Sequence, residues 1–258
     1  MPTPPTLVAA YATPPSSTAA AATMTTSSLS LQAGDVVTIV AMGAGGGSGD
    51  SFSIPTTTFA NGGVTQLALH PSSSDCQGGA WTFTVTSTGS GTVSVTHTGG
   101  TNTSQNLFVV AHRGAVAPTA ARASISIGSS YFNIYTASQA NSAIVWMVGD
   151  WSAGAVSTPL DPTPTSHGAA APGPTALPQS GTQAGQYTEW SQVLDNQTST
   201  GAITYGLLSS STSGPYTIAV VEVQGGGVFT TPGEGAKYHD DTLKMWELAG
   251  IEFSDGSF

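Results

Sequence analysis

A strand pattern that occurs twice constrains the fold of this chain more than any other feature. In the first copy, Gly91-Thr-Val-Ser-Val95 precedes Leu107-Phe-Val-Val-Ala-His-Arg-Gly114. In the second copy, Gly201-Ala-Ile-Thr-Tyr205 precedes Ile218-Ala-Val-Val-Glu-Val-Gln-Gly225 at nearly the same spacing. Short strands that cannot bury their apolar faces separately pack against one another. The pattern therefore predicts an all-β chain, an antiparallel β-sandwich built from two similar halves.

The predicted domain organisation follows from changes in composition. A Pro/Ala/Thr/Ser-rich N-terminal extension covers residues 1–30, and the pseudo-repeats cover about 31–115 and 131–226, so that the sandwich spans 1–227. Composition changes after Gly225-Gly-Gly227, and residues 228–258 are too few to bury a core of their own. We expect them to form a docking or assembly tail, with its interface made by Tyr238, Leu243, Met245, Trp246, Ile251, Phe253 and Phe258.

Charge and hydropathy exclude several partners. The chain has a formal net charge of −10 with only four lysines and arginines, so it lacks the basic surface that nucleic acids require. No apolar run approaches the ~20 residues that span a bilayer, which argues against membrane insertion. The segment Met1-Pro-Thr-Pro-Pro5 has neither the basic nor the apolar region of a signal peptide. We therefore expect the protein to be made in a cytoplasm and not to be secreted through a signal peptide.

Motifs for cofactors and metals are weak. The glycine-rich segment Gly43-Ala-Gly-Gly-Gly-Ser48 follows an apolar strand but lacks the following amphipathic helix of a dinucleotide site. Cys76 is the only cysteine, and no histidines form an i, i+4 pair. His97 is in phase with Val93 and Val95, which predicts a place at the edge of the core. We expect no cofactor and no metal, although aspartates in predicted turns leave calcium open.

Two glutamates are the candidates for the paired carboxyl groups of a glycoside-hydrolase active site. Glu189 and Glu222 both lie on predicted strands, and Glu222 is in phase with the apolar Ile218 and Val220. Glycoside hydrolysis requires two facing carboxyl groups, whereas the chain has no Gly-x-Ser-x-Gly elbow for a serine nucleophile. We expect the protein not to be an enzyme, and a Glu189/Glu222 pair within glycosidase distance would overturn that expectation.

The tryptophans divide into core and surface candidates. Trp81 and Trp146 lie within apolar strands and are predicted to be buried, whereas Trp151 follows a strand end and is the candidate for stacking on a sugar ring.

The alternation of Trp81-Thr-Phe-Thr-Val85 is followed closely by Thr92-Val-Ser-Val-Thr96. These two segments are predicted to form a hairpin with one solvated face.

Five segments carry a resemblance to a known family. They are Gly34-Asp-Val-Val-Thr-Ile-Val40, Gly91-Thr-Val-Ser-Val-Thr96, Leu107-Phe-Val-Val-Ala-His-Arg-Gly114, Ala143-Ile-Val-Trp146 and Tyr216-Thr-Ile-Ala-Val-Val-Glu-Val223. The chain resembles lectin-like jelly-roll virion proteins of tailed bacteriophages, in particular minor tail proteins of phages that infect actinobacteria. Its last residues are similar to short Trp/Gly-rich C-terminal units of phage tail and capsid-fibre proteins. The resemblance implies a jelly-roll-like sandwich and a place in the virion, and it brings no catalytic residues.

The expected function is that of a non-enzymatic virion structural protein, a minor tail or tail-tip protein that contacts other virion subunits and forms a homo-oligomer. Such a protein would be made in the host cytoplasm and located in the virion, where a host cell-surface glycan is a further candidate partner. Two alternatives stay open at this point. One is a capsid decoration protein; the other is a carbohydrate-binding module or adhesin that recognises a cell-wall glycan through Trp151.

Overall fold

The computed structural model shows a body made almost entirely of β-strands. It describes residues 3–12, 23–44, 51–70, 76–98, 104–128, 132–150, 188–197, 201–206 and 216–226, all of which belong to a compact unit of Met1–Gly227. A 3-10 turn, η1 (Ala120–Arg122), is the exception among the strands of the described part. Trp151, the Pro-rich segment 158–186 and the predicted tail 228–258 lie outside the described residues.

The first main sheet, called the β4 sheet here, has five antiparallel strands in the order β1-β11-β4-β8-β7. Its strands are β1 (Thr6–Ala12), β4 (Val36–Ala44), β7 (Thr65–His70), β8 (Cys76–Thr84) and β11 (Ser104–Arg113). The strand β1 therefore lies inside the segment predicted as an N-terminal extension.

The second main sheet, called the β15 sheet, is also antiparallel. Its order is β12-β18-β15-β16, and β13 also pairs with β18. The strands are β12 (Ala115–Val116), β13 (Ala123–Gly128), β15 (Ser142–Asp150), β16 (Thr188–Gln197) and β18 (Tyr216–Gly225).

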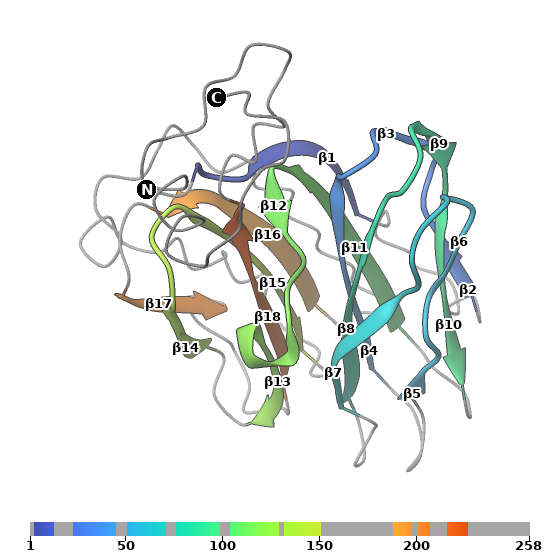
Figure 1. Ribbon diagram of the computed structural model, residues 1–258. Helices are drawn as coiled ribbons and strands as arrows, with labels where there is room; N and C mark the ends of the chain where they lie inside the picture. Colours follow the sequence, from blue (N-terminus) through green and yellow to red (C-terminus); the bar gives the residue numbers. More distant parts are fainter. Residues whose placement is uncertain are drawn as a thin grey trace, which may run out of the picture. The chain divides into compact units, whose positions relative to one another are not determined.

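Smaller sheets form further layers. Strand β10 (Val93–Thr98) pairs with β2 (Thr23–Thr25), β5 (Ser51–Phe52) and β6 (Thr56–Thr57), forming the outer sheet. Strand β3 (Leu29–Leu31) pairs with β9 (Gly89–Gly91), and β14 (Phe132–Ala137) pairs with β17 (Gly201–Gly206). Figure 1 shows the resulting sequence of layers: the β14/β17 pair, the β15 sheet, the β4 sheet, and the outer sheet.

Alternation along β4 explains how the β4 sheet is buried on both faces. Successive side chains of a strand point to opposite faces. Val37, Ile39 and Ala41 pack with the outer sheet in the outer core, while Val40 and Met42 pack against the β15 sheet in the central core. A continuous apolar run is the expected sequence of a strand covered on both sides. The run 36–42 is therefore apolar because it contributes to two cores.

The β15 sheet is built by the same rule. Val145 and Met147 of β15 lie in the central core, whereas Ile144 and Trp146 face a third core on the other side, against Tyr135 of β14. Trp81 and Trp146 are both completely buried, so their predicted core positions are confirmed. Each large indole fills the space between a main sheet and the smaller layer outside it.

Two adjacent glycines let β8 approach its neighbours on both faces. A Cβ at Gly78 would lie 2.5 Å from Ile125 Cδ1 of β13 and 2.8 Å from Met42 Sδ, in the central core. On the other face, a Cβ at Gly79 would overlap the indole ring of Trp81, with ring atom Cζ3 at 2.7 Å. Side chains at these positions would separate the sheets or displace the indole, so the close packing depends on both glycines.

The prediction of an all-β chain with antiparallel sheets packed against each other is confirmed. Strands of the structure cover each of the predicted apolar runs, which are 36–42, 107–113, 143–148 and 216–223. The predicted hairpin of residues 81–85 and 92–96 is wrong, because β8 pairs with β4 and β7 while β10 belongs to the outer sheet. The threonine face of β8 is also not solvated: Thr82 is buried and donates a hydrogen bond to the Val37 carbonyl at 2.9 Å.

Candidate functional site

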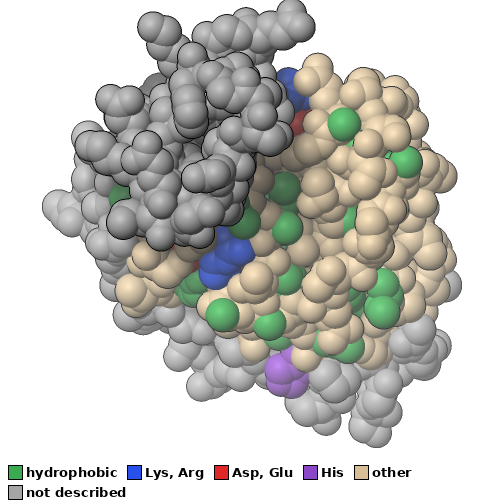
Figure 2. Space-filling model, in the orientation of Figure 1, with side chains coloured by type: hydrophobic (Ala, Val, Ile, Leu, Met, Phe, Trp, Pro, Cys, Tyr) green, Lys and Arg blue, Asp and Glu red, His purple; other side chains and the backbone are tan. Residues whose placement is uncertain are grey.

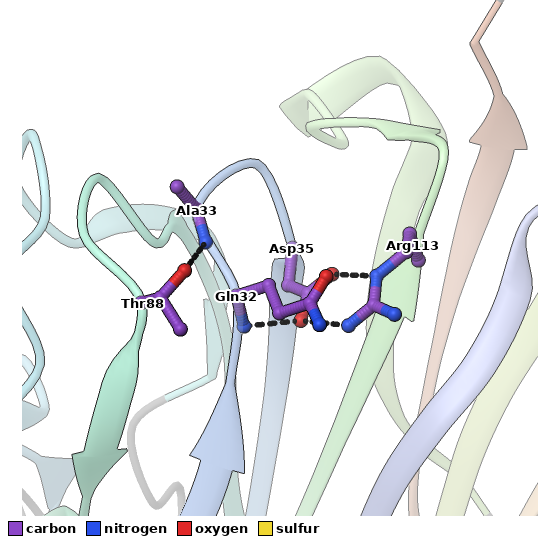
Figure 3. Close-up of polar contacts among 5 residues, drawn as sticks. All are labelled: Gln32, Ala33, Asp35, Thr88 and Arg113. Carbon is purple, nitrogen blue, oxygen red and sulfur yellow. Dashed lines mark hydrogen bonds and ion pairs between the residues drawn. The ribbon is translucent and has the colours of Figure 1, made fainter.

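A buried carboxylate at the start of β4 joins two distant parts of the chain. Gly34, with a φ of 88°, turns the backbone so that Asp35 lies directly before the strand. Asp35 is completely buried, and its carboxylate accepts a 2.7 Å hydrogen bond from the backbone N–H of Gln32. It also accepts two hydrogen bonds from Arg113 at the end of β11, at 2.9 and 3.0 Å (Figure 3). The arrangement fixes the turn before β4 to the end of the neighbouring strand.

The Arg113–Asp35 contact is a fork-like ion pair that is buried on one side only. The Arg113 side chain is 46% exposed while Asp35 is inaccessible. The hydrogen bond to Asp35 raises the pKa of Arg113 above its ordinary value, and the negative charge of Asp35 acts in the same direction. Arg113 therefore stays charged wherever the protein is folded, and it satisfies a carboxylate that water cannot reach.

A second buried carboxylate, Glu222 on β18, occupies the third core. It is completely buried on the same face of β18 as Ile218 and Val220, whereas an edge or rim place is the usual one for a glutamate. Its oxygens accept hydrogen bonds from the backbone N–H groups of Ser138 and Gln139 at 3.0–3.1 Å, from Ser138 Oγ at 2.8 Å and from the Tyr135 hydroxyl at 3.1 Å. These donors belong to β14 and the turn before β15. Glu222 therefore holds the outer layer and this turn onto the β15 sheet.

The two glutamates weighed for hydrolysis do not meet. Glu222 is the register partner of Ile144, and Glu189 is the register partner of Gly149. These positions are five residues apart along β15, which corresponds to roughly 17 Å. Paired carboxylates in glycosidases lie about 5–9.5 Å apart. A catalytic Glu189/Glu222 pair is therefore incompatible with the strand register.

His97 has the predicted place at the edge of the core and a structural environment. It is 8% exposed, its Nε2 lies 2.9 Å from Gln77 Nε2, and its ring meets the Phe52 ring edge-on at 5.7 Å. Among the described residues, no three His, Cys, Asp or Glu side chains lie close enough together to hold a metal ion. The polar atoms of this region are packed beneath the outer sheet.

The outer sheet and the β3/β9 pair both carry paired hydroxyl groups on exposed strand positions. Thr25 and Ser94 contact each other at 2.8 Å, and Thr23 and Thr96 at 2.9 Å, each pair bridging β2 and β10. Ser30 and Ser90 form a third pair, at 3.0 Å, between β3 and β9. Figure 2 shows how little charge the described surface carries on the face that it draws. Such cross-strand pairs stabilise register without charge.

The predicted site residues lie outside the described part of the chain. These are the sugar-stacking candidate Trp151 and the tail residues Tyr238, Leu243, Met245, Trp246, Ile251, Phe253 and Phe258. They stay predictions.

The polar residues that the structure does bring together were missed in the sequence. The sequence places Asp35 in a turn, where aspartate is favoured for local backbone hydrogen bonds, and it does not single out Arg113. Asp35 directly precedes the apolar strand β4 and Arg113 ends the apolar strand β11, but nothing in the sequence indicates that these two strands are neighbours.

Comparison with known proteins adds no relative: no protein-family model, no curated protein and no solved structure matches this chain. Among the described residues, no helix is long and apolar enough to cross a membrane.

Proposed function

We propose that this chain is a non-enzymatic structural protein of a bacteriophage virion, a minor tail or tail-tip subunit that acts by shape and by contact with its neighbours. The resemblance of its strand segments to lectin-like phage tail proteins motivates the choice of particle. The acidic composition, with a net charge of −10, suits a subunit that must stay soluble before assembly.

The use of the two buried carboxylates carries the non-enzymatic part of the proposal. Asp35 and Glu222 are both inaccessible to water, and both are bonded to loop backbone N–H groups and neighbouring side chains. A general acid or base must come within hydrogen-bond reach of its substrate. Carboxylates enclosed in this way stabilise turns and layers, which is what a passive building block needs.

We further propose that the body consists of two similar jelly-roll-like halves. The strand order β1-β11-β4-β8 in one main sheet parallels β13-β18-β15-β16 in the other. The turns before β4 and β15 also agree, because Gln32-Ala-Gly34 and Gln139-Ala-Asn141 both end in a left-handed residue, with φ of 88° and 59°. In this view β1 belongs to the first half rather than to an extension.

A duplicated body would give a subunit that is stiff across its layers. The β4 and β15 sheets each bury both faces, and the central core joins them with residues from β4, β8, β11, β15 and β18. Close-packed interiors transmit force with little deformation. A load applied to one end of such a body would reach the other end without unfolding it, as a tail component requires.

The test is to locate the protein on a particle. Particles are purified by density gradient from the culture in which the protein is produced. Antibodies raised against the recombinant chain should label these particles, and immunogold images should show the label at the tail. Label on the head would favour a decoration protein. Absence of the chain from particles, with the chain present in the cell lysate, would refute the virion proposal.

The carbohydrate-binding alternative needs its own comparison. Wild-type protein and Trp151→Ala are applied to purified cell-wall glycan, with Trp190→Ala as a matched tryptophan control. A structural subunit predicts no specific binding by any of the three. Saturable binding that only Trp151→Ala abolishes, with folding retained by circular dichroism, would establish a glycan-binding module instead.

A further inference from the structure

We propose that strand β1 is exchanged between copies of this chain, so that the edge of β11 receives the β1 strand of a second copy. The occupant of this edge is Thr6–Ala12 in either arrangement, and only the chain that supplies it changes. Exchange of an identical element is a recurrent, low-cost route to oligomers. A strand added to a sheet edge gains affinity from backbone hydrogen bonds and specificity from alternate side chains.

The strand β1 fits the edge of β11 as an insert between two cores. Leu7, Ala10 and Ala12 pack against the central core, whereas Val8, Ala9 and Tyr11 pack against the outer core. The change of face occurs at a bulge between Leu7 and Ala9. No residue of β1 is charged. Without a strand in this place, β11 would expose both its unpaired backbone and the rims of two apolar cores.

The acceptor site extends beyond the β4 sheet. A Cβ at Gly225, the last residue of β18, would collide with the carbonyl of Thr3. The segment before β1 therefore lies directly against the end of a strand in the β15 sheet. A β1 strand supplied by a second copy would contact both main sheets of the acceptor, which makes this edge a larger docking site than a single strand pairing.

The connections of β1 permit exchange, while those of its counterpart do not. Residues 13–22 join β1 to β2, and ten residues can span at most about 35 Å. The equivalent strand β13, which pairs with β18, is joined to β14 by residues 129–131 alone, a reach of about 10 Å. On its other side β13 begins directly after η1, at Ala123. Of these two equivalent strands, β1 has the longer connection, and that length is what reaching a neighbouring copy requires.

Concentration decides between the two arrangements, because the contacts made by β1 are the same in both. A connection of ten residues holds its own strand at an effective concentration on the order of millimolar. Copies placed side by side on a particle reach similar values. That setting rests on the proposed virion function, but the exchange itself is a property of the chain and is measurable in solution.

The experiment mixes two single-cysteine variants of the full chain, each also carrying Cys76→Ser. Ala10 and Val110 are register partners between β1 and β11, so one variant is Ala10→Cys and the other is Val110→Cys. The mixture is incubated at increasing protein concentration, oxidised mildly, and separated without reductant. Exchange predicts a covalent dimer linked through positions 10 and 110, identified by mass spectrometry, whose fraction rises with concentration.

The second half supplies a matched control. Ala123 of β13 and Val221 of β18 are also an Ala–Val register pair in the same central core. A mixture of Ala123→Cys and Val221→Cys chains should give no covalent dimer linked through those positions. Equal amounts of dimer from both mixtures would show unspecific oxidation and would refute the exchange.

A second register guards against poor folding or poor disulfide geometry. Adjacent antiparallel pairs alternate between closer and wider side-chain spacing, so Tyr11→Cys with Val109→Cys samples the other kind. Its control is Ser124→Cys with Val220→Cys. If folded variants give no mixed dimer in either register at millimolar concentration, β1 remains with its own chain and the exchange is refuted. Location of the protein on particles would be unaffected by that result.

Discussion

Replacing Gly79 by alanine tests the packing of the outer core. The new Cβ would overlap three atoms of the six-membered part of the Trp81 indole, and Trp81 is completely buried. Overpacking a well-packed core costs about 1–3 kcal/mol, and a rigid ring enclosed on all sides places this change near the upper end. In a body of this size, ~3 kcal/mol corresponds to a fall in Tm of roughly 6–12 °C. Urea unfolding and thermal scans followed by circular dichroism measure both quantities.

Two controls separate this overlap from a general effect of losing a glycine. A Cβ at Gly89 meets no atom within 4 Å, so Gly89→Ala should change the free energy of unfolding by less than about 0.5 kcal/mol. In a Trp81→Phe background the smaller ring gives room, and Gly79→Ala should cost about 1 kcal/mol less than in the wild type. Equal stability of Gly79→Ala and Gly89→Ala would refute the overlap with Trp81. So would a Gly79→Ala/Trp81→Phe double-mutant cycle in which the two changes are additive.

The two buried carboxylates give the remaining predictions. Glu222→Gln keeps the size of the side chain but places an amide donor against the Tyr135 and Ser138 donors. The free energy of unfolding should therefore fall by about 1–3 kcal/mol, and by more in Glu222→Ala. Tyr135→Phe, the matched control, removes one donor and should lower the free energy of unfolding by about 1 kcal/mol. An unchanged Tm in Glu222→Ala would contradict the inference that Glu222 holds β14 and the turn before β15 onto the β15 sheet. Arg113→Leu should lower Tm because Asp35 is left buried without its cation, and adding Asp35→Asn should restore part of the loss. If the double variant is less stable than Arg113→Leu, the ion pair is not what holds this turn.

Part of the fold could be predicted because local patterns report local structure. The apolar runs at β4, β11, β15 and β18 mark strands wherever they pack, and the phase of His97 with apolar neighbours places it at the edge of the core. The failed hairpin shows where this logic stops. Alternation in residues 81–85 and 92–96 identifies two strands, but the partner of each strand depends on which sheet it joins.

The partners of the buried acids were beyond reach for the same reason. Arg113 is 78 residues from Asp35, and Glu222 is 84 residues from Ser138. The type of residue and its position on a strand are properties of the sequence, whereas the meeting of two such residues depends on sheet order and register. Spacing along the chain carries little information about contacts at that separation.

The sequence by itself determined that this chain is all-β and that its apolar runs form strands, and its few basic residues predict that it does not bind nucleic acid. Those properties follow from side-chain chemistry and the two-residue period of a strand. The tertiary structure decided that both main sheets are buried on two faces, that Gly78 and Gly79 admit the neighbouring layers, and that Asp35 and Glu222 clamp turns. These follow from which surfaces meet, and layer packing selects those surfaces through contacts between residues far apart in the chain.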